Sequence, residues 1–177
     1  MSIATKRKQS MPYTLEEFAA DCKNALSKGN GPAELEEVRT YVSKALQDQD
    51  MVATYLPPDC GEERRVLFED PDLKFCICGH VYQGPKDGNP HDHGPTWAIY
   101  GQADGETEMT DWKIVKPANG DEPALVEQTS SYSLKPGDAH VYHVGDVHAP
   151  LRNGPTRLIR IEGEDTAFIT RTPIKAA

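Results

Sequence analysis

From Pro57 to its C-terminus the chain is a series of short β-type runs separated by Gly, Pro and Asp residues. Several strands at such short intervals are typical of an all-β sandwich or barrel. Strands are expected near residues 64–69, 73–82, 95–103, 107–115, 124–133, 139–144, 156–162 and 166–170. Residues 57–177 are therefore predicted to form one small β-barrel of ordinary domain size.

The run over residues 73–82 has two chemically different faces, because successive residues of a strand point to opposite sides. The first face holds Phe75, Ile77, Gly79 and Val81, and the second holds Cys76, Cys78, His80 and Tyr82. Three soft-metal ligands in a row on one strand fit tetrahedral geometry badly. The second face is therefore interpreted as barrel interior and not as a metal site.

Before the β-type runs, the chain has helical spacing. Residues 13–50 are predicted to be helical, and Thr14 and Glu17 form a capping box ahead of the first apolar stripe. Pro32 suits the first turn of a second helix. We expect a helical segment over residues 13–56 that packs on the barrel with two helices, and a disordered tail over residues 1–12.

The charge balance excludes two classes of partner. The 177 residues include 19 Lys and Arg and 28 Asp and Glu, for a formal net charge of −9. Nucleic acid and anionic membranes are bound through basic surface, so neither is an expected partner. No apolar run approaches the roughly 20 residues of a membrane span. Without a secretory signal, the four cysteines are expected to be reduced thiols in a cytoplasmic protein.

The strongest local signal is His91-Asp92-His93. Two histidines at positions i and i+2 of an extended chain point to the same face, so their imidazoles can converge on one metal ion while Asp92 points away. A third ligand is needed. Three histidines follow downstream: His140, His143 and His148. Imidazole suits iron, zinc, copper and nickel alike, so the ligand type does not select the metal.

A second motif resembles the second motif of the cupin superfamily. It runs from Pro136-Gly137-Asp138 through a short strand to Gly145-Asp146-Val147-His148 and Asn153. The resemblance implies a mainly β fold, the cupin double-stranded β-helix, a small jelly-roll barrel. It also implies that His148 is the third ligand, with His143 as the alternative. Most cupins add a glutamate shortly after the second histidine. This chain has Trp97 or Ala98 there, which leaves three neutral histidines and room for an anionic ligand and dioxygen.

A narrower resemblance surrounds the first motif. The stretch HDHGPTWAIYG from His91 to Gly101, followed by Gly105-Glu106, is similar to the bacterial branch of the cysteine dioxygenase family, which includes the 3-mercaptopropionate dioxygenases. The resemblance implies an iron site of three histidines. It places Arg65 close to where the family has the arginine that holds the substrate carboxylate, with Arg64 equally placed.

The chain departs from that family in two places. Ala98 stands where the animal enzymes have a cysteine cross-linked to tyrosine, so no thioether is expected. The family's Ser-x-His-x-Tyr triad corresponds to Leu158, Arg160 and Glu162, so the tyrosine over the substrate is missing. Arg160 and Glu162 lie at i and i+2 and are expected to face the barrel interior together. Burial of both charges requires that they be paired and hydrogen-bonded.

Together these patterns predict an Fe(II)-dependent dioxygenase that oxidises a small anionic thiol to a sulfinate, with zinc or nickel as other metals the site can take. The expected metal ligands are His91, His93 and His148, and the expected catalytic residues are Arg65, Arg160 and Glu162. The expected partners are a small-molecule substrate and dioxygen, with a homodimer as one option for assembly. Two alternatives stay open: a cupin dioxygenase that cleaves a C–C bond of a diketone-like substrate, and a non-catalytic cupin that binds a metal or small ligand.

Overall fold

Ten strands in two five-stranded sheets make up most of residues 64–177 in the computed structural model, which describes residues 12–177. The strands are β1 (Arg64–Glu69), β2 (Cys76–Tyr82), β3 (Lys86–Asp87), β4 (Ala98–Asp104), β5 (Thr107–Lys116), β6 (Ala124–Leu134), β7 (Ala139–Tyr142), β8 (Val147–Arg152), β9 (Thr156–Glu162) and β10 (Ile174–Ala176). The first sheet has the order β1-β2-β9-β4-β7, and the second has the order β10-β6-β5-β8-β3.

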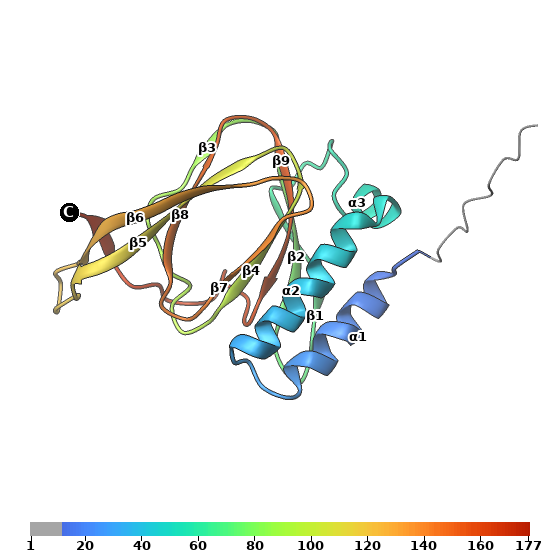
Figure 1. Cartoon of the computed structure of the whole chain (residues 1–177), viewed down its shortest axis with the longest axis horizontal. Helices are drawn as coiled ribbons and strands as arrows, with labels where there is room; N and C mark the ends of the chain where they lie inside the picture. The colour runs from blue at the N-terminus through green and yellow to red at the C-terminus, as the bar shows by residue number, and fades with distance from the viewer. Residues whose placement is uncertain (1–11) are drawn as a thin grey trace, which may run out of the picture.

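The strand pairing is nested. β2 pairs with β9, β3 with β8, β4 with β7 and β5 with β6, all antiparallel. This order arises when one long antiparallel ribbon folds over on itself, which produces a jelly roll. The two sheets face each other and enclose the barrel interior (Figure 1). The predicted fold class, a double-stranded β-helix of the jelly-roll type, is confirmed.

Three helices precede the strands: α1 (Leu15–Leu26), α2 (Pro32–Gln47) and α3 (Gln49–Tyr55). The predicted capping box is present, because Thr14 Oγ1 accepts from the Glu17 amide and the Glu17 carboxylate accepts from the Thr14 amide. The sequence predicted two helices. The third is separate because Asp48 leaves the helical conformation and caps α3 with its side chain. Over residues 12–177, no candidate membrane-spanning helix is found.

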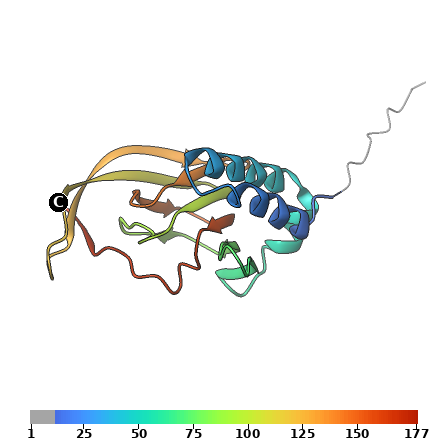
Figure 2. The ribbon, with the colours of Figure 1, turned by 90° about the horizontal axis from the view of Figure 1, so that it is seen from below.

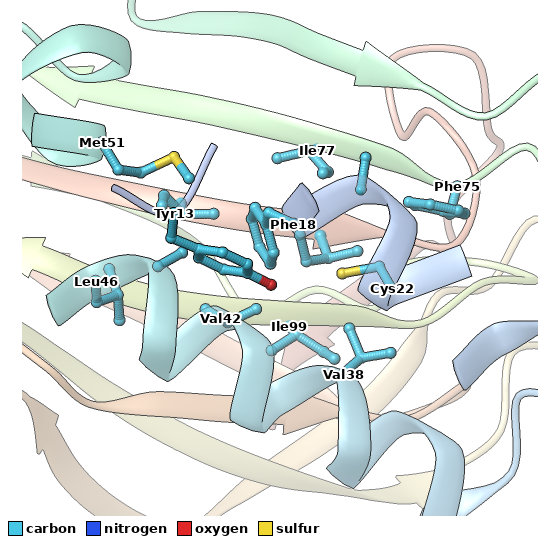
Figure 3. Packing of buried hydrophobic residues seen from close by; sticks show 14 of the residues in the cluster. Tyr13, Phe18, Cys22, Val38, Val42, Leu46, Met51, Phe75, Ile77 and Ile99 are labelled. Carbon is cyan, nitrogen blue, oxygen red and sulfur yellow. The ribbon is translucent and has the colours of Figure 1, made fainter. Parts of the chain in front are cut away.

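Helices α1 and α2 lie along one side of the strands, as the second view shows (Figure 2). Their apolar stripes meet the outer face of the first sheet, where Phe18, Val38 and Val42 gather with Ile77 and Ile99 (Figure 3). Each of these side chains is almost fully buried, and such burial contributes about 1.5–3 kcal/mol per large side chain. The outer face of β2 is therefore the apolar face that the sequence predicted.

Gly101 permits the close approach of α2 to β4. A Cβ atom at Gly101 would overlap Val42 Cγ1 and lie 3.1 Å from Leu46 Cδ1. The helix can therefore rest on the strand only because this position carries no side chain.

One expected strand is absent, and three observed strands were not expected. Residues 166–170 are not a strand, since the edge beside β6 is taken by β10 and Phe168 is 87% exposed. Strand β8 was missed because its sequence, VHAPLR, carries Pro150 and lacks clean alternation. The short strands β3 and β10 were also missed. Of the expected tail, residues 1–11 lie outside the described residues.

Candidate metal centre

Three histidines meet in the barrel interior. His91 and His93 lie in the segment before β4, and His148 is the second residue of β8. The backbones of His91 and His148 exchange two hydrogen bonds of 3.0 Å, which fixes the first motif beside the second. One ring nitrogen from each histidine lies within 4.8 Å of the others. The structure thus brings the three predicted ligands together, whereas His143 is exposed and lies outside the group.

Asp92 stabilises the loop of the first motif. Its buried carboxylate accepts hydrogen bonds from the amides of Gly94, at 3.0 Å, and Thr172, at 3.1 Å. Gly94 has a φ of 58°, and a Cβ atom there would overlap the carbonyl oxygen of Thr170. The C-terminal segment therefore runs directly against the histidine loop, and glycine is required at the contact.

The three imidazoles are neutral at pH 7. His91 Nδ1 donates to the Asn89 carbonyl oxygen at 2.8 Å, which leaves Nε2 with a free lone pair. Burial lowers the pKa of His91 to about 4 and that of His93 to about 2. Burial also lowers the pKa of His148 well below its usual value. Neutral imidazole is the form that binds metal.

The donor set fits a metal ion. The Nδ1 atoms of His93 and His148 are buried and have no hydrogen-bond partner among the described residues. Their Nε2 atoms lie 3.0 and 3.3 Å from one oxygen, the hydroxyl of Tyr100. Buried ring nitrogens are normally satisfied in native interiors. Three imidazoles that converge within 4.8 Å, two of which each carry a buried nitrogen without a partner, are therefore typical of a metal site. Iron, zinc, copper and nickel all accept such ligands.

Arg160 and Glu162 both lie inside the barrel, as the alternation along β9 predicted. The Arg160 guanidinium lies 4.0 Å from the centroid of the Tyr100 ring and donates to Glu162 Oε1 at 3.4 Å. Burial acts to lower the pKa of Arg160, but the neighbouring Tyr100 and Glu162 raise it, and the net shift is upward. The closer partners of Glu162 are Arg64, at 2.8 Å, and the Thr166 amide, at 3.0 Å. The catalytic role of Arg160 and Glu162 stays a prediction.

The structure corrects the expectation for Arg65. Its guanidinium donates to the carbonyl oxygen of Tyr55, on the helix side of the first sheet, and does not face the histidines. Arg64 is the arginine that points inward, where it binds Glu162 and also Asp165, at 2.6 Å. The β1–β2 register decides this, because Arg64 pairs with the inward-facing His80 and Arg65 pairs with Gly79.

Two inward-facing residues were not among the predicted site residues. Tyr100 follows Ala98 on the inner face of β4, so alternation along that strand was the available signal. Arg152 ends β8 and is 2% exposed, and its guanidinium lies over the ring of Tyr82. No sequence signal pointed to Arg152, because β8 itself was not predicted.

A pocket of about 340 Å³ opens beside Tyr142, and the three candidate metal ligands are not among its lining residues. Its lining includes Asp111, His140 and Tyr142. The Tyr142 ring stacks on His148 with centroids 3.9 Å apart, so this ring lies between the pocket and that candidate ligand. The hydroxyl of Tyr142 is bonded to that of Tyr132 at 2.7 Å, which holds the ring in place.

Comparisons with known proteins include remote likenesses to solved structures. No protein-family model matches the chain, and no curated protein matches it. A hydroquinone 1,2-dioxygenase solved with Cd2+ and 4-hydroxybenzonitrile is 15% identical over 65% of this chain and 68% of that chain, with a TM-score of 0.45. A double-stranded β-helix protein from Klebsiella pneumoniae is 18% identical over 68% and 93% of the two chains, with a TM-score of 0.44. A cupin superfamily protein from Desulfitobacterium hafniense is 13% identical over 58% and 76%, with a TM-score of 0.42. The fold assignment therefore rests on the strand pairing.

Proposed function

We propose that this protein is a metal-dependent dioxygenase that adds both atoms of dioxygen to the sulfur of a small anionic thiol, giving a sulfinate. The observation that carries the proposal is the interior group of three imidazoles, which includes no carboxylate among the described residues. Three neutral ligands leave the charge of a divalent ion uncompensated, so the site favours an anionic substrate ligand such as a thiolate. All the electrons that dioxygen gains come from sulfur, so no external reductant is required.

Iron(II) held by His91, His93 and His148 would supply the redox chemistry and a shared binding position for thiolate and dioxygen. The resemblance of the first motif to three-histidine thiol dioxygenases supports this choice of metal. Arg160 and Glu162 stand in place of the last two residues of the family's triad. We therefore expect a substrate other than cysteine or 3-mercaptopropionate, and weak turnover of both.

Arg152 is the side chain best suited to hold the anionic end of the substrate. Its Nε and Nη2 atoms are buried and have no partner among the described residues. Arg64, in contrast, is already paired with Glu162 and Asp165. A buried guanidinium without a carboxylate is costly, and a substrate carboxylate would satisfy it with charge-assisted hydrogen bonds. Arg152 follows His148 on β8 at an even spacing, so both side chains point inward.

Other side chains of the site orient and shield the substrate. Arg160 is held over the Tyr100 ring, where it places a positive charge next to the histidines. Glu162 fixes Arg160 from one side and is itself held by Arg64. The buried Tyr142 ring covers His148 and excludes water from that side of the site.

Oxygen uptake by the full chain, purified and loaded with Fe(II) without air, tests the proposal. The panel contains thiols with a carboxylate, neutral thiols of the same size, and diketones. We expect uptake with a carboxylate thiol and a product heavier by the mass of one dioxygen molecule. Cleavage of a diketone would instead establish the C–C-cleaving alternative. Bound metal without any turnover would establish a non-catalytic cupin.

Two arginine variants test whether Arg152 binds the anionic end of the substrate. Loss of a hydrogen bond to a charged group costs about 1.5–3 kcal/mol, so Arg152→Met should raise KM for the carboxylate thiol about 10- to 150-fold. Arg157→Met is the matched control, since Arg157 binds Asp104 and the Leu56 carbonyl outside the barrel. Equal KM values for the two variants would remove Arg152 from the site.

A further inference from the structure

The hydroxyl of Tyr100 lies between two of the candidate metal ligands. Its oxygen is 3.0 Å from Nε2 of His93 and 3.3 Å from Nε2 of His148. The side chain is fully buried and comes from the inner face of β4. It is the oxygen of the described chain that approaches both imidazoles, and nothing in the proposed thiol chemistry assigns it a task.

These separations match those between ligands of a single ion. Nitrogen and oxygen ligands bind such metals at about 2.0–2.2 Å. Two atoms bound at that length, at angles from a right angle to the tetrahedral value, lie roughly 3.0–3.5 Å apart. The distances from the Tyr100 oxygen to His93 and His148 fall in this range, so one ion can contact the hydroxyl oxygen and both imidazoles with little movement of Tyr100.

The charge at the site also favours an oxygen anion there. Ala98 lies in register with Glu162 on the neighbouring strand, but that carboxylate is held by Arg64 and the Thr166 amide. Among residues 12–177, the three neutral imidazoles therefore have no acidic side chain in their group to offset a buried divalent ion, and uncompensated buried charge is costly.

We propose that Tyr100 is the fourth protein ligand of the metal, bound through its phenolate oxygen. On metal binding the O–H bond breaks, the proton leaves to solvent, and the oxygen lone pair binds the ion, with no change of oxidation state. The ligand set is then three imidazoles and one phenolate, with the phenolate supplied two residues beyond Ala98. The phenolate offsets one of the two positive charges of a divalent ion, so one charge remains for an anionic substrate ligand. This inference rests on the metal site of the proposed function and not on the identity of the substrate.

The visible absorption of the iron(III)-loaded protein tests directly whether Tyr100 is a metal ligand. Phenolate bound to iron(III) absorbs in the visible through ligand-to-metal charge transfer, whereas imidazole alone gives no such band. We expect the full chain loaded with one iron(III) ion to be coloured, and its resonance Raman spectrum, excited in that band, to show tyrosinate ring vibrations. This measurement needs no variant, so it does not depend on a substitution being tolerated.

Two tyrosine variants identify the residue. Tyr100→Phe keeps the ring under Arg160 and should still bind iron, without the band and with an affinity at least about tenfold lower. Tyr142→Phe is the matched control. Tyr142 is equally buried and stacks on His148, but its hydroxyl forms a hydrogen bond with the Tyr132 hydroxyl. It should keep the band.

The outcomes separate this inference from the proposed function. Stoichiometric iron without a visible band in the wild-type chain would overturn the phenolate ligand and leave the three-histidine site standing. A band that persists in Tyr100→Phe would also overturn it. Failure of the wild-type chain to bind any metal would overturn the metal centre itself, and the inference with it.

Discussion

Removal of Arg64 should destabilise the barrel through Glu162. The Glu162 carboxylate is 0% exposed and its shortest charged contact is Arg64 Nη2, at 2.8 Å. In Arg64→Met the apolar part of the side chain is kept while the guanidinium is lost. Glu162 would then retain the 3.4 Å contact with Arg160 and the hydrogen bond from the Thr166 amide.

The expected loss follows from the burial of the pair. Removal of one partner of a buried ion pair costs about 3–5 kcal/mol, because it leaves an uncompensated charge. The side chain of Arg64 is 27% exposed, so water would reach Glu162 in the variant. We therefore expect the lower end of the range, about 3 kcal/mol. With a urea m-value of about 2 kcal/mol per molar, the unfolding midpoint would fall by about 1.5 M.

Urea unfolding of metal-free protein, followed by fluorescence and circular dichroism, measures this loss. Arg65→Met is the matched control. Arg65 is the next residue, and its side chain makes one hydrogen bond among the described residues, to the Tyr55 carbonyl oxygen. It should cost about 1 kcal/mol, the typical net value of one hydrogen bond. The double variant Arg64→Met with Glu162→Gln removes the buried charge and should regain at least about 1 kcal/mol relative to Arg64→Met.

Equal losses in Arg64→Met and Arg65→Met would refute the reasoning, because they would place both arginines in equivalent surroundings. A double variant no more stable than Arg64→Met would show that the unpaired carboxylate is not the source of the loss.

Metal binding should depend on His148 and not on His143. In elemental analysis, His148→Ala should lose its metal and His143→Ala should keep it. The reverse result would make His143 the third ligand. Burial, together with the positive charges of nearby arginines, lowers the pKa of His80 well below its usual 6.5. The unfolded chain then binds a proton that the folded chain does not, so stability is full above about pH 6.5 and falls as the pH drops. Between about pH 6.5 and 5.0, protonation of His80 in the unfolded chain lowers the free energy of unfolding by about 2 kcal/mol. His80→Gln should remove this loss, as measured by urea unfolding of metal-free protein at several pH values. The same pH dependence of stability in both proteins would contradict the assignment. Gly101→Ala should lower the free energy of unfolding by about 1–3 kcal/mol, because the added Cβ overlaps α2. Thermal unfolding measures this against Gly84→Ala, whose added Cβ meets no atom within 4 Å. Equal melting temperatures would show that α2 shifts without a loss of stability.

The sequence by itself determined the local secondary structure and which residues share one face of a strand or helix. Alternation along residues 73–82 separated an apolar face from one with Cys78 and His80, and these faces are the helix-packed and interior sides of β2. The capping box of Thr14 and Glu17 located the start of α1. Such features depend on residues a few positions apart, whose relative directions are set by the period of the strand or helix. The pairing of His91 with His93 was readable for the same reason.

Tertiary structure alone decided which of two neighbouring residues faces the site. Arg64 and Arg65 are equivalent in sequence, but the register of β1 against β2 turns Arg64 inward, and a shift of one residue would exchange them. Strand β8 escaped prediction because its stability comes from pairing with β5, more than thirty residues earlier in the chain, and not from its own sequence pattern. The approach of Tyr100 to His148 spans 48 residues. Contacts at such separations depend on how the sheets close, which no local period encodes.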